Sequence, residues 1–116
     1  MSRDPRLYVD DLVQCGERVL EYTSGMTFAA FLADRRTVDA VVRNLELIGE
    51  AVKHLPEAWK GLHPQVPWKQ IAGLRDVVAH AYFAVDEELI WDVVTRHVPA
   101  LLGVARKLLA VDDSAE

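Results

Sequence analysis

Apolar residues recur every three or four positions along most of the chain, a spacing that places them on one face of an α-helix. The pattern is clearest between Arg35 and Leu55, where the apolar positions are Val38, Val41, Val42, Leu45, Ile48, Val52 and Leu55. No useful length of sequence alternates apolar and polar residues as a strand does. The pattern therefore predicts an all-α protein, an up-and-down helical bundle of four main helices plus one or two short helices.

Capping and turn residues predict the ends of the first elements. Asp4 is the expected N-cap of the first helix, Pro5 occupies its first position, and Gly25 follows its end. Thr27 is expected to cap a short helix before the long one. The inward face of the first helix is predicted to carry Tyr8, Leu12, Cys15, Val19 and Tyr22.

The second half of the chain has the pattern of one loop between two further main helices. Glycine and proline mark the loop at residues 61–67, and Trp68 begins the helix that follows. Asp86 is the expected cap of the last helix, which Pro99 is expected to kink. That helix carries the apolar residues Leu89, Ile90, Val93, Val94, Leu101, Leu102, Leu108 and Leu109.

Length and composition fit one domain. The 116 residues are 51% hydrophobic and 27% charged, so we expect a single domain over 1–116, with its core at about 4–110 and a flexible polar tail at 111–116. Cys15, the single cysteine, is expected in the core. The N-terminus has no signal-like apolar run, and no run approaches the ~20 residues of a membrane span. A cytoplasmic protein that does not contact membranes is expected.

The net charge of −5 argues against a protein that coats nucleic acid by broad charge neutralisation. A contact with RNA would need a small basic site, which more than one chain could build together. His54, His63 and His97 lie in different predicted elements and are expected at the surface or at helix ends, without a metal site. Trp59, Trp68 and Trp91 could stack on bases, although Trp68 and Trp91 are expected to pack in the core.

The segment "RDVVAHAY", residues 75–82, gathers the residues with chemical potential. On a helix, Asp76 and His80 are neighbours at i and i+4, so the carboxylate can orient the imidazole. Arg75 and His80 are five apart, about 140° around the helix. They can share a site if the arginine swings round, if the helix is distorted, or if two chains contribute to one cleft.

These residue types suit cleavage of RNA without a metal ion. An imidazole that titrates near neutrality can remove the proton from a ribose 2′-OH, and a guanidinium can stabilise charge on the phosphate. The structural alternative is an Arg75 that pairs with Asp76 and a His80 that caps or fills a helix end. Residue types alone leave both interpretations open.

The segment resembles the R-x4-H-x-Y motif of HEPN-domain ribonucleases. Together with "NLELIGEAVK" upstream and the frame of "PWKQIAGLRDVVAHAY", it resembles the HepT family of toxins over roughly residues 7–110. The resemblance implies a helical homodimer with a composite cleft. It also implies a metal-independent endoribonuclease of a toxin–antitoxin pair, whose partner is a minimal nucleotidyltransferase, MntA, that can adenylylate the motif tyrosine.

Carried over to this sequence, the resemblance makes Arg75 and His80 the catalytic pair and Tyr82 the candidate site of modification. Asp76 takes a position where many relatives have asparagine. It would either place a negative charge beside the RNA phosphate or hold His80. Asn44 and Glu50, on the long helix, are further candidates for the cleft. No cofactor and no DNA are expected, and a glycine-rich phosphate loop is absent.

A second hypothesis keeps the same fold but removes the chemistry. In it the chain is a non-catalytic helical binding module, the partner subunit of a nucleotidyltransferase. The two hypotheses differ in whether the cleft cleaves RNA.

Overall fold

The structure is a computed structural model that describes residues 3–74 and 87–114, the last four of these by their backbone alone. Within these ranges every regular element is helical, which confirms the all-α prediction. The elements are α1 (Pro5–Thr23), α2 (Phe28–Ala33), α3 (Arg35–Lys53), α4 (Glu57–Gly61), α5 (Trp68–Ala72), α7 (Glu87–Asp92), the π-helical turn η1 (Val93–His97) and α8 (Val98–Ser114). None of the described helices is long and apolar enough to cross a membrane.

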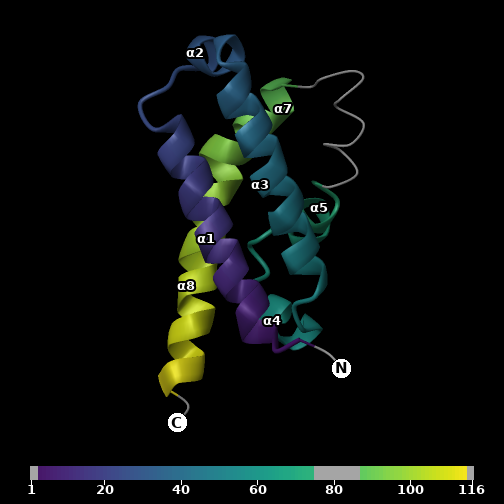
Figure 1. Cartoon of the computed structure of the whole chain (residues 1–116). Helices are drawn as coiled ribbons and strands as arrows, with labels where there is room; N and C mark the ends of the chain where they lie inside the picture. The colour runs from purple at the N-terminus through teal and green to yellow at the C-terminus, as the bar shows by residue number, and fades with distance from the viewer. Residues whose placement is uncertain (1–2, 75–86, 115–116) are drawn as a thin grey trace.

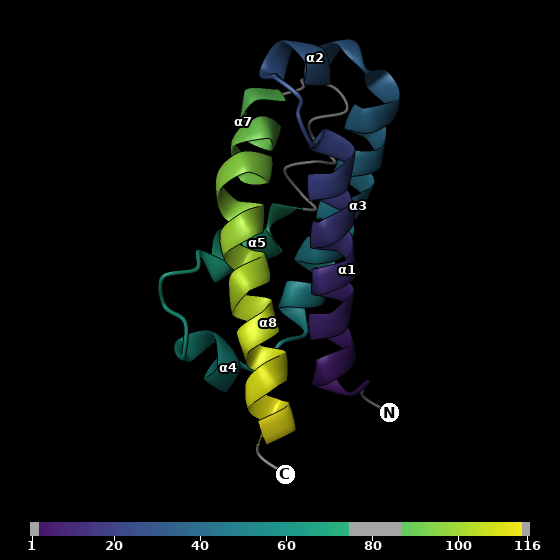
Figure 2. The same ribbon diagram turned by 90° about the vertical axis from the view of Figure 1, so that its left-hand side faces the viewer.

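Three long rods lie side by side (Figures 1 and 2): α1, α3, and a continuous rod formed by α7, η1 and α8. α1 runs antiparallel to the other two and packs against both α3 and α8. The two chain ends lie at one end of the bundle, and α2 crosses the opposite end. α5, the described start of the predicted fourth main helix, packs on α3.

The first helix begins as its sequence predicts. The Asp4 carboxylate accepts a hydrogen bond from the Arg6 backbone N–H at 2.9 Å, and Pro5 takes the first helical position. Gly25 has φ +75°, a conformation that glycine adopts without a Cβ clash. Tyr22, predicted to face inward, is instead 39% exposed.

Thr23 takes the inward place in the last turn of α1. Its hydroxyl donates to the Val19 carbonyl at 2.8 Å, so a polar side chain can be buried there without losing a hydrogen bond. Tyr22 can then leave its hydroxyl in water. The periodic pattern could not choose between two adjacent residues at a helix end.

The long helix α3 follows its predicted pattern. Its inward residues Val38, Val41, Leu45, Ile48 and Val52 are all buried, with Leu55 just beyond its end, while Val42 is partly buried. Asp34 caps the helix, accepting hydrogen bonds from the Thr37 hydroxyl at 2.8 Å and the Thr37 N–H at 3.2 Å. These bonds favour the charged form and hold the pKa of the Asp34 carboxyl below its usual range.

A glycine allows α1 and α8 to approach closely. A Cβ on Gly16 would lie 2.8 Å from Leu102 Cδ2, so the leucine occupies the space that a side chain would need. The neighbouring Cys15 is buried as predicted, and burial raises the pKa of its thiol. A thiol in this setting is a packing residue, because the reactive thiolate is disfavoured.

The last rod is distorted where Pro99 predicts a distortion, but the distortion is a π turn. Pro99 has no N–H to donate to the carbonyl of Thr95, so the α-helical pattern is interrupted there. The Val98 N–H donates instead to the Val93 carbonyl, five residues back. Beyond the turn, the backbone of α8 continues to Ser114 and so includes residues 111–114 of the predicted tail.

Candidate active site

The four motif residues, Arg75, Asp76, His80 and Tyr82, lie outside the described residues, as does the predicted cap Asp86. Their assigned roles therefore remain predictions. The structure does describe the two places where the chain leaves and re-enters this segment, Leu74 and Glu87, and both are held by specific contacts.

The leaving end is held by α5 and the loop before it. The Trp68 indole N–H donates to two backbone carbonyls, those of Lys60 and His63, each at 3.0 Å. Ile71 and Leu74 are buried in the core that α5 shares with α3. Trp68 thus closes the loop onto the start of the helix and positions Leu74, and its ring is partly buried against the core.

The re-entering end is held by an aromatic cluster between α2 and α7. The Trp91 ring lies 5.0 Å from the fully buried Phe31 ring and 6.2 Å from the Phe28 ring, centroid to centroid. Tilted pairs at such distances are favourable beyond their buried area. An exposed ion pair joins Arg35 to Glu87 at 3.2 Å and adds little because water screens it.

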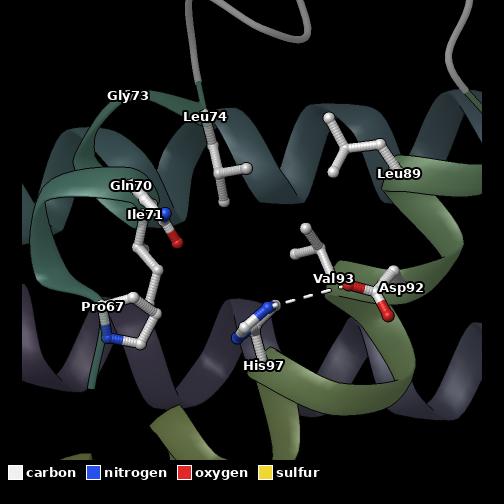
Figure 3. A pocket seen from close by; sticks show the side chains of 9 residues that line it. All are labelled: Pro67, Gln70, Ile71, Gly73, Leu74, Leu89, Asp92, Val93 and His97. Carbon is white, nitrogen blue, oxygen red and sulfur yellow. Dashed lines mark ion pairs between the residues drawn. The ribbon is translucent and has the colours of Figure 1, made fainter. Parts of the chain in front are cut away.

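A pocket of about 450 Å³ lies between these two ends (Figure 3). Leu74 contributes from one side and Leu89 from the other, so the segment that carries the motif leaves and returns beside the same pocket. Leu89 is 39% exposed. The described residues that line it are Pro67, Gln70, Ile71, Gly73, Leu74, Leu89, Asp92, Val93 and His97.

An acid–histidine pair lies at one wall of this pocket, shown by the dashed line in Figure 3. His97 Nε2 is 3.8 Å from Asp92 Oδ2, and the other Asp92 oxygen pairs with Arg96 Nε at 3.2 Å. Residues five apart point about 140° apart on a regular α-helix. They meet here because η1 is a π turn, in which residues five apart stack along the axis.

The sequence does not reveal this pair, because on a regular helix Asp92 and His97 would point apart, and His97 was expected at the surface or at a helix end. Pro99 was the one available signal, since it predicted a distortion without giving its type. The pocket combines apolar walls with an imidazole, a carboxylate and the Gln70 amide. Such a lining can hold a flat polar group and hydrogen-bond its edge.

Asn44 and Glu50 are not brought together, and neither lines this pocket. The Asn44 side chain is buried and donates to the Ala40 carbonyl at 2.9 Å. Glu50 lies on the side of α3 that faces α1, 3.5 Å from Nε2 of His54. His54 in turn stacks on Tyr8 at 4.5 Å between ring centroids.

Two of the histidines expected at the surface or at helix ends therefore have carboxylate partners, His54 with Glu50 and His97 with Asp92. Among the described residues, these carboxylates and imidazoles do not form any group of three that could hold a metal ion.

Over residues 12–108 the chain matches the family described as ribonuclease HepT-like. It belongs to this HepT-like family. The expected family resemblance is thereby confirmed, and the match spans the pocket as well as the motif segment.

The HepT-like chain also resembles individual relatives over most of its length. It is 42% identical to the "Probable ribonuclease HepT" of Thermococcus cleftensis, over 93% of this chain and 98% of the relative. It is 46% identical to a Methanocaldococcus jannaschii protein named "Putative RNase", over 84% of this chain and 81% of the relative. A protein of Caldanaerobacter subterraneus, also named "Putative RNase", is 39% identical over 92% of this chain and 96% of the relative. No solved structure matches the chain.

Proposed function

We propose that this HepT-like chain is a metal-independent endoribonuclease, the toxin of a HEPN–nucleotidyltransferase toxin–antitoxin pair in the cytoplasm. One observation carries the proposal: the family match spans residues 12–108 and so includes the R-x4-H-x-Y motif at 75–82. The relatives named above as ribonucleases support the same reaction class.

In the proposed reaction, neutral His80 removes the proton from a ribose 2′-OH. The 2′-oxygen attacks the adjacent phosphorus, the bond from phosphorus to the 5′-oxygen breaks, and that oxygen takes a proton from solvent. The products are a 2′,3′-cyclic phosphate and a 5′-hydroxyl. Arg75 stabilises the additional negative charge on the phosphate oxygens, and Asp76 orients the His80 ring.

This mechanism predicts that RNA cleavage continues when divalent metals are removed. The base and the anion stabiliser are both side chains, so a chelator should leave the rate unchanged within about twofold. The measurement is cleavage of a labelled RNA in EDTA, with the new ends identified by mass spectrometry. Loss of cleavage in EDTA with recovery in magnesium, or products that lack the cyclic phosphate, would contradict the mechanism.

We also propose that the active form is a homodimer. Arg75 and His80 are five residues apart and would be badly placed to meet on one regular helix. A two-fold axis that brings two copies of the segment together would supply both groups to each cleft. Sedimentation of the purified chain at micromolar concentration should show a dimer, and a monomer alone would count against a shared cleft.

The proposed antitoxin is an MntA-like nucleotidyltransferase that transfers AMP from ATP to the Tyr82 hydroxyl, releasing pyrophosphate. The added phosphate would compete with the RNA phosphate for Arg75, and the purine would block entry to the cleft. We expect the modified protein to lose cleavage activity while keeping its fold. Incubation with the partner and ATP, followed by peptide mass mapping, checks this. This proposal would be refuted if the AMP were found on another residue. It would also be refuted if the partner's AMP-transfer activity still stopped RNA cleavage by the Tyr82→Phe variant.

A further inference from the structure

A second pocket lies on the other side of α5 from the one described above, and it gathers most of the lysines of the chain. Its volume is about 600 Å³, and Lys53, Lys60 and Lys69 all line it. The whole sequence contains four lysines, so three of them converge here from α3, α4 and α5. The other described residues that line it are Glu57, Gly61, Trp68 and Ala72.

The described residues of this lysine pocket carry a net positive charge, although the chain carries −5 overall. Among them, three ammonium groups accompany one carboxylate, that of Glu57, which lies 3.3 Å from Lys60 Nζ. The Lys60 side chain is 13% exposed and that of Glu57 is 91% exposed, so water screens the carboxylate more than the ammonium. Within the described ranges, Lys53 and Lys69 are exposed and have no ion pair.

An indole completes the pocket. The Trp68 N–H is already used by the carbonyls of Lys60 and His63, so the indole has no free donor and offers ring carbon to a ligand. Bases of a single strand stack on such rings whatever their sequence, because every base has a π face. Lysines that follow a phosphate backbone beside an aromatic platform are the usual composition of a site for single-stranded nucleic acid.

We propose that the lysine pocket binds the phosphodiester backbone of single-stranded RNA, outside the cleft of the catalytic motif. The inference deepens the proposed ribonuclease function and rests on it. α5 presents Lys69 and Ala72 to the lysine pocket, and Gln70, Ile71 and Leu74 line the other pocket. A strand held by the lysines therefore lies across one helix from Leu74, the residue directly before Arg75. It would keep the substrate near the motif without taking part in the reaction.

The test measures RNA binding in a full-length His80→Ala background, so that cleavage cannot interfere. Fluorescence anisotropy with a labelled single-stranded RNA is recorded over a series of salt concentrations. The logarithm of the association constant falls linearly with the logarithm of the salt concentration, with a slope of about −0.7 for each phosphate contact on a single strand. Replacing Lys53, Lys60 and Lys69 together by glutamine should therefore make this slope less steep by about 2. At 0.1 M salt this corresponds to a loss in affinity of up to about a hundredfold.

Two comparison proteins separate a local site from a general charge effect. A triple variant with Arg6→Gln, Arg43→Gln and Lys107→Gln removes the same charge from α1, α3 and α8, outside the lysine pocket, and should keep most of the slope. The single variant Glu57→Gln removes the opposing carboxylate and should tighten binding. Circular dichroism and thermal melts confirm that every variant is folded.

The proposal is wrong if the lysine variant keeps the salt dependence of the His80→Ala protein, or if the control triple variant loses as much of that dependence as the lysine variant does. It is also wrong if the His80→Ala protein binds no RNA at low salt. It is also wrong if the lysine variant loses only its binding to the nucleotidyltransferase, because the pocket would then recognise a protein. Failure of the ribonuclease function is seen separately, as absence of cleavage by the natural sequence at any RNA concentration. With cleavage intact, the lysine variant should raise KM and leave kcat unchanged.

Discussion

Replacing His80 by alanine should lower the rate of RNA cleavage by about 10²- to 10⁴-fold, the usual contribution of a general base. The variant loses the only group proposed to remove the 2′-OH proton, while Arg75 and the RNA-binding surface remain. Single-turnover cleavage of a labelled RNA, measured at saturating enzyme, separates this loss of chemistry from weaker binding.

The matched control is His63→Ala. His63 lies in the loop before α5, and its contact with Trp68 is through its backbone carbonyl, which the substitution keeps. This variant should cleave RNA at the natural rate. If His80→Ala also cleaves at the natural rate, His80 is not the base. If neither the natural sequence nor any variant cleaves RNA, the alternative of a non-catalytic partner subunit becomes the better account.

Phe31→Ala should lower the free energy of unfolding by about 3–5 kcal/mol, the usual cost of deleting a buried phenylalanine. The Phe31 ring is fully buried and lies 5.0 Å from Trp91, so its loss leaves a cavity where α2 meets α7. Urea unfolding followed by tryptophan fluorescence and circular dichroism should show a lower midpoint and an unchanged m-value.

Phe28 supplies a matched control for that measurement. The Phe28 ring centroid lies 6.2 Å from that of the same indole, but Phe28 is only partly buried. Phe28→Ala should therefore lower the free energy of unfolding by less than Phe31→Ala does. Equal losses for the two variants would mean that burial is not what makes Phe31 important. A loss below about 1 kcal/mol for Phe31→Ala would show that the site collapses around the missing ring.

Local sequence signals were enough to predict most of the fold. Asp4 and Thr27 are the N-caps of α1 and α2, as the sequence predicted. The buried residues of α3 follow the predicted helical period closely. The error, Tyr22, lies near a helix end. There, tertiary packing decides which of two adjacent residues is buried, and periodicity carries no information about it.

The candidate site could be predicted only in part. The motif at 75–82 is contiguous, so a resemblance could identify it from the sequence. The pocket between Leu74 and Leu89 forms through packing between distant segments and has no local signature. The same holds for the three lysines, which are spaced along residues 53–69 as ordinary surface charges and converge only when α3, α4 and α5 fold together.

The π turn at Val93–His97 makes the number of residues in the last rod as important as their identity. A π turn holds one residue more than an α-helical turn, so η1 is in effect an insertion that the fold accommodates. Deleting one of its residues would turn the π turn into a regular α-helical turn and keep α7 and α8 close to their present faces, with Asp92 and His97 then four positions apart and still neighbours. Deleting a residue within α8 would instead rotate the helix before the deletion by about 100° relative to the helix after it, and Trp91 would leave Phe31. The rod should therefore tolerate the loss of one residue within the π turn better than a change of length elsewhere.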